Sequence, residues 1–372
     1  MATALFILAI ITLWEPVDPR IYSLKMQLLG PEFTLLYPDS LSAMTFLPSY
    51  IPAQGGMWLQ SNQKTILAWK SGFFVGFAGD YRSDNHQSVD TYRMSTDISD
   101  IGNYQLLFGK RLLQNYGILL FLQDKRFSNL ESQTSDTSGD VQRVSESEHS
   151  PKISLGLSIA QSWGYIALYV GQRSYWMKRR SILEMGDTSV VSRKDDTLSI
   201  YTILGVKGTF WGGKSILELN LEIHRPKQFV QTMTSHGGER VTTEESHSYS
   251  PIFHEGIQFA WLKEYRLKNL RLYLGLSQSI RPLNTLRYGE FAYTGKLPVT
   301  LVFHKNSWNF YAHSSLAFTW TRKPIPIHEV EEAATLSNLW NFAAEWFVTP
   351  NLHVFFRWGW VTDPDLELTF RF

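Results

Sequence analysis

The chain has 372 residues, of which 44% are apolar and 14% aromatic, and its 35 Lys and Arg nearly balance its 34 Asp and Glu. This composition is that of a folded protein, and the balanced charge gives no reason to expect a nucleic-acid partner. Because the sequence contains no cysteine, disulfide scaffolds and thiolate metal sites are excluded.

The first 53 residues differ in character from the rest. Residues 1–14 are apolar and as long as the hydrophobic part of an export signal, so a signal peptide is predicted here. No Lys or Arg precedes this run and no Ala-x-Ala site follows it, which leaves a mis-assigned start or a short buried segment as alternatives. Residues 15–53 show no clear period and are predicted as a periplasmic lead-in or a plug inside a lumen.

From residue 54 to residue 372, alternating apolar and polar positions predict strands joined by connections that are alternately short and long. No apolar run after residue 14 reaches the ~18–20 residues of a membrane helix. The short connections lie near 71–72, 112–115, 163–164, 211–214, 265–268, 305–307 and 348–351, and the longer ones near 83–100, 127–150, 177–196, 225–250, 281–297 and 323–335. This asymmetry is typical of transmembrane barrels with short periplasmic turns and long extracellular loops.

We therefore predict an all-β chain forming a transmembrane, antiparallel up-and-down β-barrel of about 14–16 strands, beginning with a strand near 55–60. The polar segment 127–150 is predicted to be a mobile external loop, and residues 228–246 a hairpin around Gly237-Gly238 that projects beyond the barrel. A soluble β-sandwich is the alternative. The length of the strands and the Trp and Tyr residues at their ends favour the membrane barrel.

One segment matches a nucleotide-binding pattern. Residues 208–215 read Gly-Thr-Phe-Trp-Gly-Gly-Lys-Ser, which fits G-x-x-x-x-G-K-[ST]. That motif requires a following helix, whereas the apolar residues at 217, 219, 221 and 223 have the period of a strand. The segment is therefore interpreted as a glycine-rich hairpin turn.

The sequence predicts no catalytic residue, metal site or cofactor. Four histidines, His224, His236, His247 and His254, lie near several glutamates, but their spacing matches no known ligand set. His313 and Ser314 are adjacent, so on a strand they point to opposite faces and cannot form a catalytic pair.

The polar face of the strands is predicted to line the lumen. The candidate lumen-lining residues carry both signs of charge, which indicates a polar interior without strong ion selectivity; they are Lys207, Glu218, Asn220, Glu222, His224, Arg271, Tyr273, Asn309, Tyr311, His313, Glu345, His353, Arg357, Glu367 and Arg371. An alternative for each is a purely structural role in ion pairs and hydrogen bonds that hold the wall together.

The last strand is predicted to close the barrel against the first one. Its apolar positions, Leu366, Leu368, Phe370 and Phe372, alternate with polar residues up to the C-terminal Phe. This segment resembles the terminal signature of bacterial outer-membrane β-barrels. The resemblance implies an assembly signal read by the barrel-assembly machinery, and placement in the lipid of the bacterial outer membrane.

Strand-turn-strand units such as residues 101–122 resemble those of the OmpP1/FadL-type barrels, which include long-chain fatty acid transporters and related secretion barrels. The Asn-Pro-Ala segment often found near the front of that family is absent, and Tyr37-Pro38 is only a remote substitute. The resemblance implies passage of hydrophobic small molecules, and it carries over no ligand residue.

The predicted function is an outer-membrane channel or transporter, not an enzyme, that passes small solutes, hydrophobic ones among them, through a polar-lined lumen. The alternative is a non-transport barrel, an adhesin or a structural or secretion component, that acts through its extracellular loops. The sequence leaves the solute and the oligomeric state open.

Overall fold

The computed structural model describes residues 24–29, 33, 36, 44–45, 48, 51–52, 54–61, 64–90, 93–113, 115–135, 140–161, 164–185, 189–210, 214–236, 239–249, 251–282, 291–324, 330–359 and 364–372. The predicted signal peptide, residues 1–14, lies outside these ranges. Within these ranges, Leu24–Leu29 form the helix α2. Among the described residues no helix is long and apolar enough to cross a bilayer.

The strands alternate with short connections along the rest of the chain. They are β1 (Gly56–Gln60), β2 (Thr65–Lys70), β3 (Phe73–Asp90), β4 (Arg93–Leu113), β5 (Tyr116–Ser135), β6 (Val141–Gln161), β7 (Gly164–Met185), β8 (Ser189–Phe210), β9 (Ser215–His236), β10 (Glu239–Ser248), β11 (Ile252–Leu267), β12 (Leu270–Pro282), β13 (Phe291–Lys305), β14 (Trp308–Pro324), β15 (Val330–Thr349), β16 (Leu352–Gly359) and β17 (Asp365–Arg371).

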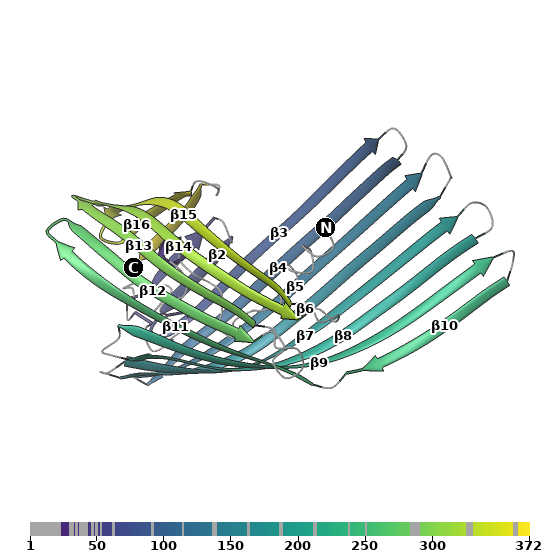
Figure 1. The fold of residues 1–372 in the computed structure, drawn as a ribbon. Coiled ribbons are helices and arrows are strands. Elements are labelled where there is room, and N and C mark those ends of the chain that lie inside the picture. The colour runs from purple at the N-terminus through teal and green to yellow at the C-terminus, as the bar shows by residue number, and fades with distance from the viewer. Residues whose placement is uncertain are drawn as a thin grey trace.

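These strands form one closed antiparallel barrel (Figure 1). Closure is made by β17 and β1, whose register runs from Gly56 opposite Arg371 to Gln60 opposite Glu367. The predicted pairing of the last strand with the first is thus confirmed. Strands β10 and β11 both pair with β9, one after the other along its length, so they act as a single interrupted strand and the ring has 16 strands.

The short connections lie where the alternation predicted them. Between β2 and β3, Ser71 and Gly72 have φ angles of 50° and 80°, as a two-residue hairpin turn with matching right-handed twist requires. The segment from Gly208 to Ser215 ends β8 and begins β9, and no helix follows it because residues 215–236 are a strand. The phosphate-loop interpretation is therefore excluded by the structure.

The prediction of long extracellular loops is wrong for the first half of the barrel. Strands β3 to β9 are 18–22 residues long, and residues 127–150, predicted as a mobile loop, belong mostly to the paired strands β5 and β6. The hairpin predicted around residues 237–238 exists, with His236 opposite Glu239. Together these strands form a sheet that projects well beyond the ring (Figure 1).

The opposite side of the ring is low. Strands β1, β2, β16 and β17 contain only 5–8 residues. β2 reaches only to Phe77 on β3, and β16 pairs with β15 only from Asn341 onward. The ring is therefore asymmetric, with a short seam at its closure and a tall wall formed by β3 to β10.

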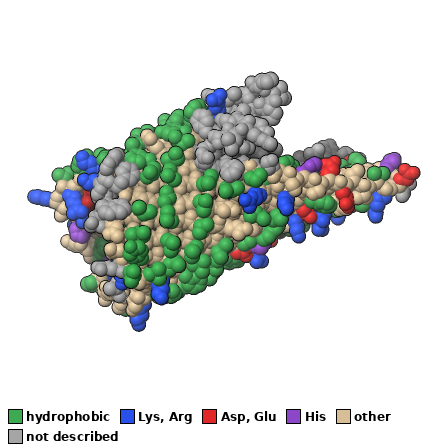
Figure 2. All heavy atoms as spheres, turned by 90° about the horizontal axis from the view of Figure 1, so that it is seen from below, with side chains coloured by type: hydrophobic (Ala, Val, Ile, Leu, Met, Phe, Trp, Pro, Cys, Tyr) green, Lys and Arg blue, Asp and Glu red, His purple; other side chains and the backbone are tan. Residues whose placement is uncertain are grey.

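Near the short turns, the outward side chains are apolar and the inward ones are buried. On β3, for example, Phe73, Val75 and Phe77 are 46%, 36% and 45% exposed, whereas Phe74 between them is fully buried. A tilted strand needs about 9–11 residues to cross a bilayer, which matches the extent of these outward apolar positions. Figure 2 shows hydrophobic side chains in rows over the ring and charged side chains along the projecting sheet. This outward apolar surface is the membrane band of the barrel.

Candidate functional site

The strands place all the predicted lumen residues on the inward side of the ring. Eight are buried: Lys207, Glu218, Glu222, Tyr273, Tyr311, His313, Glu345 and Glu367. Six are half-buried: Asn220, His224, Asn309, His353, Arg357 and Arg371. Arg271, whose side chain is 50% exposed, lies beside Glu264 near a short turn. That these residues line a path for a solute stays a prediction.

One buried ion pair joins β8 to β9 across the inner wall. Lys207 and Glu218 are register partners, their Nζ and Oε2 atoms lie 3.2 Å apart, and their side chains are only 4% and 9% exposed. Asn220 donates a 2.8 Å hydrogen bond to the same carboxylate. Because both charges are removed from water, the pair fixes the register of these strands as well as contributing polarity.

A second cluster lies farther along the same strands, toward the projecting sheet. Arg173 on β7 lies 3.9 Å from Glu222 and 4.2 Å above the ring of Tyr201, which in turn stacks on His224 with centroids 4.2 Å apart. Arg173 was not predicted as a site residue, although it follows the inward positions of β7 at a spacing of two. On β6, beyond the membrane band, burial raises the pKa of the Glu148 carboxyl above its ordinary value.

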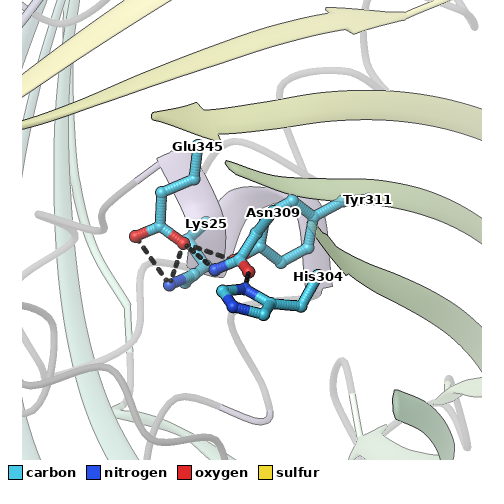
Figure 3. Close-up of polar contacts among 5 residues, drawn as sticks. All are labelled: Lys25, His304, Asn309, Tyr311 and Glu345. Atoms are coloured by element: carbon cyan, nitrogen blue, oxygen red, sulfur yellow. Dashed lines mark hydrogen bonds and ion pairs between the residues drawn. The ribbon is translucent and has the colours of Figure 1, made fainter. Parts of the chain in front are cut away.

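The third cluster brings together three predicted residues and one from the N-terminal segment (Figure 3). Glu345 accepts hydrogen bonds from Tyr311 at 2.6 Å and from Asn309 at 2.9 Å. Its other partner is Lys25 of α2, whose Nζ lies 3.1 Å away and 5.6 Å from the centre of the Tyr311 ring. The Glu345 carboxylate thus has three polar partners, and one of them, Lys25, comes from the N-terminal segment inside the ring.

A second contact holds the start of α2 to the wall. The backbone N–H of Leu24 donates a 2.6 Å hydrogen bond to Glu367 on β17. Leu24, Met26 and Leu28 are almost completely buried, and they belong to one apolar cluster with inward side chains of the wall, namely Ile216, Ala260, Tyr273, Val302, Tyr311, Ala343 and Phe355. The helix therefore lies against the inner wall, with its lysine and its first N–H group on carboxylates.

The inner wall of β1 to β8 carries a large apolar cluster beside buried polar side chains such as Gln105, Gln123 and Lys152. Inward side chains of β1 to β8 form one buried cluster with Met44 and Ile51 of the N-terminal segment; among them are Trp58, Leu67, Phe74, Leu107, Leu119, Phe121, Tyr169 and Ile203. Sequence reasoning missed them because segments such as 118–122, Ile-Leu-Leu-Phe-Leu, are apolar on both faces and lack alternation. A run of that kind predicts a strand with no solvated face.

The remaining predicted residues make separate contacts. His313 Nδ1 lies 2.8 Å from the Thr300 hydroxyl, and Tyr273 donates a 2.9 Å hydrogen bond to Glu264. His353 packs edge-on against Phe347, and Arg357 is paired with Asp365. These residues join neighbouring strands, as the structural alternative proposed for each of them requires.

The histidines considered as metal ligands lie in different surroundings. His236 is 2.6 Å from the Ser189 hydroxyl and His247 is 3.3 Å from Glu245, whereas His224 faces the lumen. The side chain of His254 lies outside the described set. Within the part of the chain that the structure describes, no three metal-ligating side chains come together.

The four residues of the predicted assembly signal lie on the outward side of β17. Leu366, Leu368 and Phe370 are half-buried, and Phe372 is 70% exposed while its N–H donates a 2.9 Å hydrogen bond to the carbonyl of Gly55. The backbone hydrogen bonding of the last strand thus extends to Phe372. Its recognition by an assembly machinery stays a prediction.

The sequence matches no protein-family model and no curated protein. Several solved barrels are similar in structure. The toluene transporter TodX from Pseudomonas putida has 10% identity and a TM-score of 0.46, over 95% of this chain and 99% of that one. The toluene transporter TbuX from Ralstonia pickettii has 10% identity and a TM-score of 0.42, over 89% and 93%. The ferric yersiniabactin uptake receptor FyuA from Yersinia pestis has 7% identity and a TM-score of 0.44, over 83% and 70%. At such low scores these likenesses carry no functional weight, and the assignment of the chain as a closed antiparallel barrel of 16 strands rests on its strand pairing.

Proposed function

We propose that this protein is an outer-membrane channel for small hydrophobic molecules and that residues 15–53 form a plug that closes its lumen. The observation that carries the proposal is the apolar cluster on the inner wall of β1 to β8, which includes the buried side chains of Met44 and Ile51 from the N-terminal segment. A water-filled porin has a polar lining. An apolar lining disfavours hydrated solutes and favours molecules that lose little by leaving water.

The plug is held by polar contacts on one side and apolar contacts on the other. Lys25 and the Leu24 N–H group bind Glu345 and Glu367, and Met44 and Ile51 pack into the apolar cluster of β1 to β8. Hydrophobic contacts are not directional, so an apolar solute can replace the plug against the β1–β8 wall while the carboxylates hold α2. This supports transient displacement of the plug, rather than a permanently open pore.

Uptake by whole cells tests this function. Cells that express the barrel should take up N-phenyl-1-naphthylamine, a hydrophobic dye excluded by an intact outer membrane, faster than cells with the empty vector. The variant Phe121→Asn, which places an amide on the apolar wall, should lose most of that gain. Its folding is checked by heat-modifiable migration on gels.

Liposome swelling separates the alternatives. The channel proposed here should admit sugars poorly. Rapid entry of sugars without dye uptake would identify a hydrated porin instead. Entry of neither would favour a non-transport barrel, an alternative that the projecting sheet of β3 to β10 also supports, because it offers a large extracellular surface.

A further inference from the structure

A groove on the outward face of the tall wall combines aromatic and cationic side chains. It lies across β7, β8 and β9, and has a volume of about 310 Å³. Its lining includes Trp176, Leu198 and Phe229, together with Lys178 and Lys227. The two lysines are exposed, and they approach the groove from the strands on either side of β8. Two ammonium groups thus flank a floor that is apolar apart from Asp196, the register partner of Lys178.

The height of the groove places it at the surface of the membrane. Starting from the short turn, β7 begins at Gly164, and its outward residues Ile166, Leu168 and Val170 are 39%, 51% and 47% exposed. A tilted strand leaves the hydrocarbon after about 9–11 residues, so Trp176 and Lys178 are the next outward side chains beyond that limit. On β9, which begins at Ser215, the same count ends just before Lys227. Both strands therefore put the groove in the headgroup layer on the side of the long hairpins.

The outward residues around the groove carry an excess of positive charge. Besides Lys178 and Lys227, the exposed side chains Arg180 and Arg225 occupy outward positions of the same strands. One carboxylate, Asp196, lies among them, and it is 3.2 Å from Lys194. A second, Glu244 on β10, accepts a hydrogen bond from Gln231 at 2.8 Å. The local charge is thus positive although the whole chain is nearly neutral.

The tall wall does not have this excess everywhere. On β5, for example, the outward side chain of Asp124 lies 2.9 Å from Arg126 and 2.6 Å from His149. At that position the outward cation has an acidic neighbour, so the excess of positive charge around the groove is not repeated there.

We propose that this groove binds the phosphate-bearing headgroup of a lipid in the outer leaflet. Tryptophan and phenylalanine suit the boundary between hydrocarbon and headgroups, and lysine stems extend along an apolar surface while their ammonium groups reach the polar layer. The phosphate lies between Lys178 and Lys227, and the first acyl carbons rest on Trp176 and Leu198. This proposal requires the barrel to sit in a membrane, but it does not depend on transport of any solute.

The test compares lipid retention in nanodiscs. Wild-type barrel is placed in phosphatidylcholine containing a small fraction of phosphatidic acid, and the lipids that remain bound after detergent extraction are counted by native mass spectrometry. The wild type should retain phosphatidic acid over phosphatidylcholine. The double variant K178Q/K227Q should lose roughly 30-fold in apparent affinity at low salt, as expected for two surface cations. The control variant R126Q removes a paired cation from the outward face of the same wall and should behave as the wild type.

The outcomes are decisive in either direction. Preferential retention that K178Q/K227Q abolishes, with heat-modifiable migration unchanged, supports the proposal. Equal retention by wild type and K178Q/K227Q overturns it, as does equal loss in R126Q. Competition by millimolar inorganic phosphate, with no preference among lipids, would show that the groove takes free anions instead of a lipid.

Discussion

Replacing Lys25 by methionine tests how the N-terminal segment is held in the lumen. Lys25 and Glu345 are 17% and 10% exposed, and their charged atoms lie 3.1 Å apart. Methionine keeps the aliphatic part of the side chain and removes the charge. Glu345 then retains hydrogen bonds from Tyr311 and Asn309, but it loses its ion pair with Lys25.

The structure sets the size of the effect. Breaking a buried ion pair by removing one partner costs about 3–5 kcal/mol. Because the carboxylate keeps two neutral donors and Lys25 is partly exposed, we expect a cost of about 2–3 kcal/mol for the bound plug. Since 1.4 kcal/mol is a factor of ten, the equilibrium between seated and displaced plug should shift roughly 30- to 140-fold toward displacement.

Planar-bilayer recording measures this shift. The wild type should be closed most of the time, and Lys25→Met should raise the open probability by about that factor. The matched control is Lys305→Met, at an exposed position next to the short turn between β13 and β14. This change should leave the open probability unchanged. Exchanging the charges in K25E/E345K should restore most of the closure. If Lys25→Met folds normally and its open probability equals that of the wild type, the ion pair does not hold the plug.

Three further changes have defined outcomes. Lys207→Met should lower the free energy of unfolding in urea by about 3 kcal/mol, because it leaves Glu218 buried without its cation, and K207M/E218M should recover most of the loss. Gly109→Ala should destabilise the barrel by about 1–3 kcal/mol in the same assay, since the added Cβ would lie 2.0 Å from the Phe74 ring, whereas Gly208→Ala, with no contact closer than 3.3 Å, should cost less. Deleting Phe372 removes the last hydrogen bond to Gly55 and should leave a larger fraction of unassembled chain on cold gels; unchanged assembly would argue against a terminal signal.

The arrangement of the barrel could be predicted from side-chain alternation and turn residues. Both depend on local sequence. Gly72 was therefore sufficient to predict a tight turn, and the period of residues 217–223 was sufficient to predict a strand. The terminal strand also specified its own partner, because an even number of strands with both ends on one side leaves β17 and β1 to pair.

The height of the wall could not be predicted. Residues such as Ser145, Glu146 and Ser147 are polar on both faces and resemble a loop. They form a strand because each has a backbone partner on both sides, for instance Arg180 opposite Ser145 on β7 and Leu130 on β5. Hydrogen bonding to neighbours far apart in the sequence gives no local periodicity, so the signal was missing.

Only part of the candidate site could be predicted. Glu345 and Glu367 follow the inward period of their strands, but their contacts with Lys25 and Leu24 join residues more than 300 positions apart. The apolar cluster on β1 to β8 was missed because a strand that is apolar on both faces shows no period by which inward and outward positions can be told apart.

A reversible bridge across the lumen tests the central claim, that the N-terminal segment closes this barrel from inside. The chain contains no cysteine, so Lys25→Cys and Glu345→Cys can be introduced together and joined by a short bis-methanethiosulfonate linker, which forms a reducible disulfide with each thiol and releases sulfinate. We predict a high open probability before bridging, near-complete closure after it, and recovery on reduction, all in the same bilayer recording. A channel that conducts equally in the bridged and reduced states would contradict the account.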